Sequence, residues 1–318
     1  MRIFFPPTSY FLFFLACLFF PACDDSSSVD LSAGLVSVFS GRGRQPGSLI
    51  KPRGIAISPD QNIYVVDITG RIQAFSPLGA YLFGFRTPKI EKGKPTGMGF
   101  SAQGNLYVAD THYHRILCYS PRGRLLFQFG KYGTRPEQFV YVTDVAISRK
   151  GYIYVAQYGD ALGKYDRIQK FDKSGHFICA WGKRGRQPGE FDRPMSLAFE
   201  ASGNLLVADA CNHRIQRFSE NGEFLATWGH PGVGQGYLSY PYGIAVDTKG
   251  NIWVSEFGNN RIQKFSPTGV SEGCFGIAGR QKGMFANPWD IAISKSNEIY
   301  VVDALNHRIQ KISPQLFE

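Results

Sequence analysis

The sequence predicts an all-β fold, a six-bladed β-propeller of four-stranded antiparallel blades. A strip of the form Arg-Ile-Gln-x-Phe recurs along the chain at intervals of 44 to 52 residues. Six units of about 47 residues fill residues 34–318, which leaves no room for a second domain. The 36 glycines and the aromatic content of 14% agree, because they suit a fold with many turns and many strands. The six copies of the strip begin at Arg71, Arg115, Arg167, Arg214, Arg261 and Arg308.

Each unit carries the signals of four short strands. An apolar strand such as residues 54–57 comes first, and a turn such as Gly104-Asn105 supplies the positive φ that tight hairpins require. The second strand, for example residues 106–110, is apolar on both faces, and the Arg-Ile-Gln strip forms the third. After another Gly turn, the fourth strand ends in an aromatic-Gly pair such as Trp181-Gly182. One such sheet cannot bury both of its faces alone, whereas six sheets stacked radially can.

The sixth unit lacks a fourth strand of its own, because the chain ends soon after its third strand. Residues 37–40 read as the missing strand. The residues that follow, 41–47, nearly repeat residues 182–189, which come after the fourth strand of the third unit. We therefore expect the N-terminal strand to close the ring and to remove an open sheet edge.

The first 22 residues predict an export signal. Arg2 is their only charged residue, and residues 10–20 form an apolar stretch of 11 residues, which suits a signal peptide and is short for a membrane span. The Ala22-Cys23 pair and the polar residues after it resemble a bacterial lipobox. The prediction is a signal peptide at 1–22, a lipidated Cys23 with a tether at 23–33, and a propeller at 34–318. A plain cleaved signal and an uncleaved anchor are the alternatives.

This organisation predicts a monomeric lipoprotein that is held on the outer side of a bacterial membrane by its lipid alone. Export permits disulfides, and four cysteines allow three pairings, among which the sequence does not choose. The chain has no Cys-x-x-Cys pair that would indicate a zinc ribbon. The four cysteines of the propeller segment are Cys118, Cys179, Cys211 and Cys274.

The chain is basic, with a net charge of +10, and basic residues gather in the connections between the units. If these connections share one face, that face is strongly positive and suits an acidic protein, an anionic polymer or an anionic ligand. Export disfavours nucleic acid as the partner. A solvated basic face without a specific partner is the alternative. The residues of the predicted basic face are Arg42, Arg44, Arg135, Lys183, Arg184, Arg186 and Arg280.

The residues around the strip resemble the signature of the NHL-repeat family. The segment 209–216 reads Asp-Ala-Cys-Asn-His-Arg-Ile-Gln and recurs at 303–310 as Asp-Ala-Leu-Asn-His-Arg-Ile-Gln, with weaker copies at 110–115 and 256–261. The resemblance covers nearly all of residues 34–318 and implies the propeller fold. It implies several functions, because NHL propellers serve as RNA readers, protein-binding platforms, ubiquitin-ligase substrate domains and, in one branch, a lyase. The fold alone does not choose among these functions.

Propellers of this kind usually bind ligands at one mouth of the central channel. The residues that begin the innermost strands line this mouth and differ from unit to unit, although a scaffold alone would keep them alike. They offer a charge, two aromatic rings and two acceptors, which suit a polar ligand with apolar faces. Drift at tolerant positions is the alternative. The predicted ligand site consists of Arg53, Asp144, Tyr242, Trp289 and Asp290.

The same positions bear on catalysis. The peptidyl-amidoglycolate lyases that the family includes take zinc-binding histidines from a Pro-His-Ser-Leu segment, whereas this chain has Pro-Met-Ser-Leu at residues 194–197. The resemblance therefore does not carry over the lyase metal site, and we assign no catalytic residue, metal or cofactor. The sequence favours a non-catalytic binding platform over an enzyme. A metal-dependent propeller enzyme and an RNA-binding or ubiquitin-pathway adaptor remain as alternatives.

Two further sets of polar residues recur at the ends of the second strands. The carboxylates there could hold Ca²⁺, but each is followed by the Arg of the strip, so that ion pairs are the prediction. Three histidines at the same turn could hold zinc, but they belong to the repeat signature, so that a role in the turn is the prediction. The two sets are Asp67, Asp110, Asp209, Glu256 and Asp303 with Gln157, and His114, His213 and His307.

Overall fold

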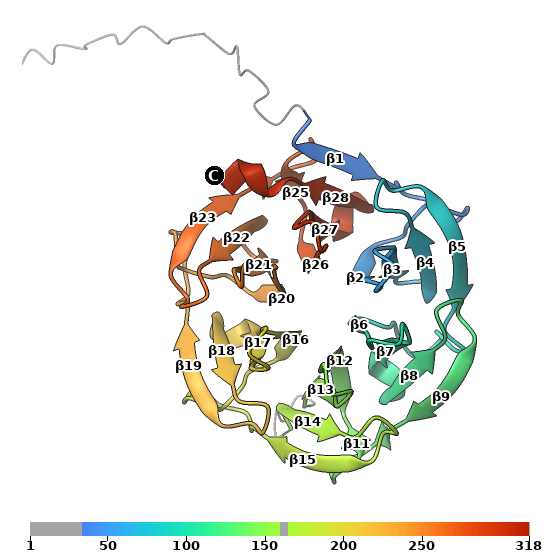
Figure 1. The fold of residues 1–318 in the computed structure, drawn as a ribbon, viewed down its shortest axis with the longest axis vertical. Helices are drawn as coiled ribbons and strands as arrows, with labels where there is room; N and C mark the ends of the chain where they lie inside the picture. Colours follow the sequence, from blue (N-terminus) through green and yellow to red (C-terminus); the bar gives the residue numbers. More distant parts are fainter. Residues whose placement is uncertain (1–33, 160–164, 318) are drawn as a thin grey trace, which may run out of the picture. The chain divides into compact units, whose positions relative to one another are not determined.

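The computed structural model describes residues 34–159 and 165–317, which form a ring of six four-stranded antiparallel sheets around a central channel (Figure 1). This confirms the predicted all-β propeller. The predicted signal peptide, Cys23 and the tether lie outside the described residues. In the described part of the chain, no helix is long and apolar enough to cross a membrane.

The first five blades run from the channel outward in chain order. Blade one consists of β2 (Pro52–Ile57), β3 (Ile63–Asp67), β4 (Arg71–Phe75) and β5 (Tyr81–Arg86). Blade two consists of β6 (Met98–Phe100), β7 (Leu106–Asp110), β8 (Arg115–Tyr119) and β9 (Leu125–Phe129). Blade three consists of β12 (Tyr141–Ile147), β13 (Ile153–Tyr158), β14 (Arg167–Phe171) and β15 (Phe177–Trp181). Blade four consists of β16 (Pro194–Phe199), β17 (Leu205–Asp209), β18 (Arg214–Phe218) and β19 (Phe224–Trp228). Blade five consists of β20 (Pro241–Val246), β21 (Ile252–Glu256), β22 (Arg261–Phe265) and β23 (Ser271–Phe275).

Blade six combines both ends of the propeller segment. Its inner strands are β26 (Pro288–Ile293), β27 (Ile299–Asp303) and β28 (Arg308–Ile312), and its outer strand is β1 (Val36–Phe39). β1 pairs antiparallel with β28, with Val36 opposite Ile312. The predicted closure is confirmed, with the strand one residue earlier than expected.

The hydrophobic core lies between neighbouring blades. Every residue of β3, β7, β17, β21 and β27 is buried, as the two-sided apolar pattern of the second strands predicts. The glycine of the turn between third and fourth strands and the aromatic residue that ends a fourth strand also have a structural reason. Gly222 turns with φ of +89°, and a Cβ on it would lie 2.5 Å from the Trp181 ring of the preceding blade. The turn glycine and the aromatic residue therefore fit together across the blade boundary.

The connections between blades, here called linkers, take a common form before five of the six blades. Each closes on itself through a short parallel pairing, as between β10 (Lys131–Tyr132) and β11 (Gln138–Phe139), or between β24 (Ile277–Ala278) and β25 (Met284–Phe285). In the other three linkers, a single parallel β-bridge closes the loop, between residues 42 and 49, 184 and 191, or 231 and 238. The linkers and the turns between second and third strands lie at the same end of the blades, which we call the linker face. The hairpin turns lie at the opposite end, the hairpin face.

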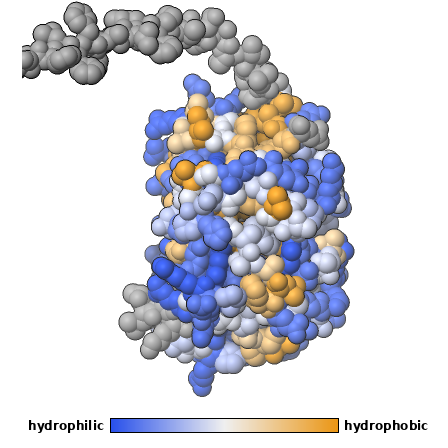
Figure 2. Space-filling model, turned by 90° about the vertical axis from the view of Figure 1, so that its left-hand side faces the viewer, coloured by the Kyte–Doolittle hydropathy of each residue, from blue (hydrophilic) through white to orange (hydrophobic). Residues whose placement is uncertain are grey.

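The outer strands present apolar side chains to solvent. Leu82, Leu125, Ile178 and Leu225, from four different blades, are each more than two-fifths exposed. On the flank that Figure 2 displays, hydrophobic residues form separate patches between hydrophilic ones. The apolar surface visible there is therefore divided into patches.

We expect deletion of residues 34–41 to lower the melting temperature of the whole propeller. The deletion removes β1 and leaves β28 as an open edge, and it also removes the Phe39 ring that packs against Phe75 and Tyr300 with centroid distances of 5.3 and 6.5 Å. Thermal unfolding followed by circular dichroism measures the effect. An unchanged melting temperature would contradict closure by β1.

Candidate functional site

The carboxylates at the ends of the second strands are engaged in ion pairs. In blade six, Arg308 Nε lies 2.6 Å from Asp303 Oδ2, and the other guanidinium nitrogens donate to the linker carbonyls of Arg280, Gln281 and Met284. Gln310 Nε2 donates to the same Met284 carbonyl at 2.6 Å. The predicted ion pairing is confirmed, and its purpose is to fasten the linker. The same pair recurs as Asp67–Arg71, Asp110–Arg115, Asp209–Arg214 and Glu256–Arg261.

The three repeated histidines connect neighbouring blades. Each has positive φ at the turn, as predicted for a turn role. The Nδ1 atoms of His213 and His307 accept hydrogen bonds from the backbone N–H groups of Tyr240 and Lys51, at 3.2 and 3.0 Å. The His114 ring contacts the Val140 carbonyl. Burial lowers the pKa of all three imidazoles. Within residues 34–159 and 165–317, no group of three or more His, Cys, Asp or Glu side chains is arranged to hold a metal ion.

Three of the predicted ligand-site residues meet at the channel mouth on the linker face. The Arg53 guanidinium carbon lies 4.6 Å from the centre of the Trp289 ring, and the Tyr242 ring meets Trp289 edge-on with a centroid distance of 5.2 Å. Phe257 stacks on Tyr242 at 4.5 Å. Sequence reasoning missed Phe257, although the equivalent turn position in blade four holds the small Ala210. The sequence did carry a signal for Phe257, because a large aromatic ring stands at a position where blade four has alanine.

A second set faces the same mouth from blades three and four. The Arg193 guanidinium carbon lies 5.0 Å from the centre of the Tyr158 ring, which stacks on Tyr141 at 5.1 Å. Burial lowers the pKa of Arg53, and the positive charge of Arg193 lowers it further. The side chains of Tyr158 and Tyr242 act in the opposite direction and raise this pKa. The two arginines therefore interact across the mouth. Arg193 and the two tyrosines were not predicted, because Arg193 precedes β16, Tyr141 begins β12 two residues before Thr143, and Tyr158 ends the second strand β13.

Both guanidinium groups have unused hydrogen-bond donors. Among the described residues, no carboxylate lies within 4.0 Å of either group, and none accepts a hydrogen bond from either side chain. Arg193 Nε is buried without a partner. A buried donor without an acceptor is unfavourable, so Arg193 is prepared for an acceptor supplied from outside, and the unused donors of Arg53 can bind the same group. This is the arrangement that an anionic group with a flat apolar neighbour would complete.

The two predicted acceptors lie in the channel wall and bind neighbouring blades. Asp144 Oδ2 accepts from Leu197 N at 2.8 Å and from Ser196 Oγ at 3.1 Å, which joins blade three to blade four. Asp290 Oδ2 accepts from Ile55 N at 3.0 Å, which joins blade six to blade one. Their oxygens are occupied within the protein, so we assign both residues a structural role in place of the predicted ligand contact.

The seven residues of the predicted basic face are all exposed on the linkers. Two of them have acidic neighbours: Lys183 Nζ lies 3.2 Å from Glu190 Oε1, and Arg184 Nη2 lies 3.8 Å from Asp192 Oδ2. These exposed pairs neutralise little of the face, because solvent screens them. The basic residues thus surround the mouth in which Arg53 and Arg193 lie.

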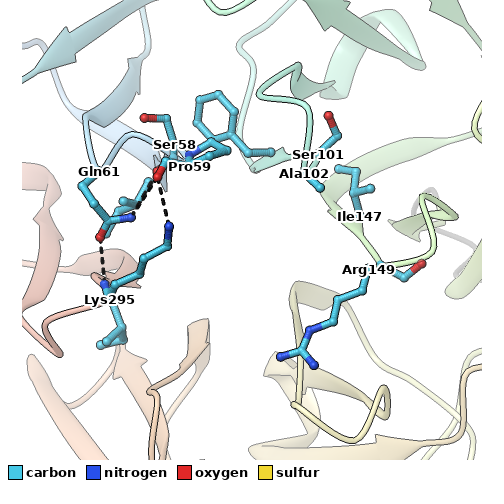
Figure 3. Close-up of a pocket in the computed structure, with 12 residues that line it drawn as sticks. Ser58, Pro59, Gln61, Ser101, Ala102, Ile147, Arg149 and Lys295 are labelled. Atoms are coloured by element: carbon cyan, nitrogen blue, oxygen red, sulfur yellow. Dashed lines mark hydrogen bonds between the residues drawn. The ribbon is translucent and has the colours of Figure 1, made fainter.

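The other end of the channel holds a cavity of about 500 Å³, lined by the ends of innermost strands from blades one, two, three and six (Figure 3). Its polar groups are used within the protein. Lys295 Nζ donates to the Pro59 carbonyl at 3.2 Å, and Lys295 N donates to Gln61 Oε1 at 2.8 Å. The Ser58 and Ser101 hydroxyl oxygens accept backbone N–H groups of their own turns. The mouth on the linker face, with its unused guanidinium donors, is therefore the better candidate site.

The four cysteines of the propeller are free thiols. Burial raises the pKa of Cys118 to about 11 and also raises those of Cys211 and Cys274. A raised pKa keeps a thiol protonated near neutral pH and lowers its nucleophilicity. Cys118, Cys211 and Cys274 are therefore not prepared as nucleophiles.

Comparison with known proteins matches the NHL-repeat family model to residues 191–218, 238–265 and 285–312. The chain carries NHL repeats. Each match begins at the end of a linker and stops at the end of a third strand, so the repeat signature coincides with the residues that fasten the linkers. The predicted resemblance is confirmed for these repeats and for the six-bladed fold.

Two curated relatives are similar over part of the chain. The protein brain tumor of Drosophila melanogaster is 31% identical over 117 residues, which cover 36% of this chain and 10% of that protein. The peptidyl-glycine alpha-amidating monooxygenase of Mus musculus is 28% identical over 189 residues, which cover 56% of this chain and 18% of that protein. The chain thus spans less than a fifth of the length of either relative.

Solved structures share the fold over most of the chain. A streptogramin B lyase superimposes with a TM-score of 0.62 at 16% identity and covers 87% of this chain and 97% of its own. A gluconolactonase from Xanthomonas campestris gives a TM-score of 0.62 at 13% identity over the same share of each chain. At these identities the likeness shows the fold alone.

We expect the stability of the propeller to fall as the pH rises between about 4 and 7. Burial raises the pKa of Asp144 to about 7, from 3.8 in the unfolded chain, and raises that of Asp290, to which the Asp144 charge adds. The native state therefore binds more protons than the unfolded state in this window, and the stability is lost as the proton leaves. Across this range, the melting temperature of the wild type should fall relative to that of the Asp144→Asn variant as the pH rises. Parallel curves would contradict the titration.

Proposed function

We propose that this NHL-repeat propeller is a non-catalytic binding platform that takes an anionic ligand at the channel mouth of the linker face. The observation that carries the proposal is the pair Arg53 and Arg193, whose guanidinium groups lie on aromatic rings with no acceptor among the described residues. An oxyanion would satisfy donors that the protein itself leaves unused.

The surroundings of the pair support a ligand that also has a flat apolar part. The rings of Trp289, Tyr242 and Phe257 border the mouth on one side, and Tyr158 and Tyr141 border it on the other. Rings on two sides favour a planar group between them, or an aromatic or proline side chain of a partner protein. The exposed basic residues on the linkers would attract such a ligand from a distance.

Binding without catalysis is supported by the use of the residues that could otherwise do chemistry. His213 and His307 accept backbone N–H groups of neighbouring blades, His114 contacts a backbone carbonyl, and the buried carboxylates bind Arg side chains or backbone N–H groups. At the position where the lyase segment has histidine, Met195 is buried against Tyr242 and Ala210. These side chains stabilise the scaffold and the mouth.

We expect the Arg53→Ala and Arg193→Ala double variant to bind a planar anion such as phenyl phosphate about a hundredfold more weakly than the wild type, because two charge-assisted hydrogen bonds are lost. Isothermal titration calorimetry on the folded protein measures the affinity. The matched control is Arg42→Ala with Arg44→Ala, which removes the same charge from the linker face outside the mouth. Equal loss in both variants would place the binding on the basic face in general. If the Arg53→Ala and Arg193→Ala double variant keeps the wild-type affinity, the anion does not bind at the mouth and the proposal is wrong.

The proposal includes export and a lipid anchor at Cys23, on the grounds of the apolar N-terminal segment and the lipobox-like residues around that cysteine. A lipid anchor would present the propeller at the surface of a bacterial membrane without a protein span.

We expect Cys23→Ser to release the protein from the membrane fraction, because serine cannot carry the thioether-linked lipid. Fractionation of cells followed by immunoblotting measures the distribution. Cys118→Ser is the matched control and should leave the protein with the membrane. If the Cys23→Ser protein also stays with the membrane, the lipobox assignment is wrong.

A further inference from the structure

Blade two leaves its repeat arginine unsatisfied. Arg115 Nε donates to Asp110 Oδ2 at 2.8 Å and Nη1 donates to Gln128 Oε1 at 3.0 Å, but Nη2 is buried without a partner among the described residues. In the other five blades, the same guanidinium donates to two or more carbonyls of the preceding linker. Blade two lacks these bonds.

The carboxylate of the same blade is also incompletely used. Asp110 Oδ1 is buried and has no hydrogen-bond donor within the described residues. In blades one, four, five and six, an oxygen of the equivalent carboxylate accepts a linker N–H, from Ile50, Asp192, Ser239 and Ala286 respectively. Blade two therefore has a hydrogen-bond donor, Arg115 Nη2, and an acceptor, Asp110 Oδ1, that find no partner among the described residues. At this place the other blades bind the main chain of their linker.

The cause is visible in the sequence. The linker before blade two, residues 87–96, forms no parallel pairing like the other linkers, and the step from Arg71 to Arg115 is the shortest in the repeat. Leu117 replaces the glutamine that binds the linker in the other blades, and Tyr113 replaces the asparagine of blades four to six. The residues that would fasten a linker are lost together with the linker loop.

A recess of about 630 Å³ lies at this place on the linker face. Arg115 lines it together with the exposed side chains of Lys92 and Lys131, and Tyr132, which is 65% exposed, borders it. The recess therefore has two free positive charges and an aromatic ring at its rim.

The Tyr113 ring covers the unsatisfied guanidinium, with its centre 5.1 Å from the guanidinium carbon. Only exposed hydrogen bonds hold the Tyr113 hydroxyl, which donates to Glu91 Oε2 at 2.7 Å and accepts from Lys92 N at 3.1 Å. Water can replace both bonds at little cost, so the ring can move aside when a better partner arrives.

We propose that an acidic peptide segment of a partner protein docks in this recess, with its main chain in the place that the linker loop occupies in the other blades. Once Tyr113 moves aside, a main chain offers a carbonyl to Arg115 and an N–H to the buried Asp110, which does not itself line the recess, whereas a phosphate ion offers mainly acceptors and leaves Asp110 without a donor. The charges of Lys92 and Lys131 select acidic side chains on either side of the docked segment. This site adjoins the channel mouth, since His112 and His114 of its lining contact Tyr141. Its charged groups are different ones, so it does not depend on the function proposed for the mouth.

The test is the binding of a fluorescein-labelled peptide of alternating glutamate and glycine to the full-length chain in detergent, measured by fluorescence anisotropy at about 0.15 M salt, where long-range charge effects are screened. We expect Lys92→Glu with Lys131→Glu to weaken binding about tenfold. The matched control, Arg186→Glu with Lys282→Glu, changes the net charge equally on linkers that cover their arginines, and it should change the affinity less than about twofold. Tyr113→Asn uncovers Arg115 and should tighten binding by about threefold or more.

Three outcomes would overturn the proposal. Equal weakening by the control variant would show that the peptide binds the basic face without a specific site. An unchanged affinity in Tyr113→Asn would show that Arg115 takes no part. Displacement of the peptide by inorganic phosphate at an equal concentration of charge would make the recess an anion site. Because Arg53→Ala with Arg193→Ala should leave peptide binding unchanged, the two proposed sites can fail independently.

Discussion

The propeller depends on a buried ion pair with which blades one, four, five and six hold the linker before them. A carboxylate at the end of the second strand binds the arginine that begins the third, and the arginine then donates to main-chain carbonyls of the linker. The carboxylates are fully buried, so removal of one arginine would leave an uncompensated charge at a cost of about 3–5 kcal/mol. The pair also supplies donors to carbonyls that would otherwise be unsatisfied in a closely packed loop. One interaction thus fixes the fold of a blade and its connection to the preceding one.

This constraint explains which positions are repeated and which are not. The carboxylate, the arginine and the glutamine of the strip all take part in the linker contacts, and His213 and His307 bond to the neighbouring blade, so these positions recur. The residues that begin the innermost strands make none of the linker contacts, and their side chains differ from blade to blade. Arg53, Tyr242 and Trp289 are therefore free to form a site without loss of the scaffold.

Blade two shows the result when the linker loop is missing and the ion pair has no linker to hold. Without the closed linker loop, its arginine and carboxylate keep their mutual ion pair, but each has one buried atom that finds no partner in residues 34–159 and 165–317. A repeat protein that loses a loop in one copy also leaves an opening of the shape that the loop filled in the others. The departure from the repeat, and not the repeat itself, is what gives blade two a surface different from its neighbours.

The sequence by itself determined the number of blades, the strand order and the closure by the N-terminal strand, because these follow from the repeat length and from periodicity that is local in the chain. It also identified Arg53, Tyr242 and Trp289 as residues of one mouth, since variation within a repeat stands out. Only the tertiary structure showed that Arg193, Tyr158 and Phe257 complete that mouth, and that Asp144 and Asp290 bind neighbouring blades instead. The aspartate roles depend on hydrogen bonds across blade boundaries, between residues 53 and 235 positions apart, and the Arg193 role depends on a contact with Tyr158 of another blade. No local pattern encodes such contacts.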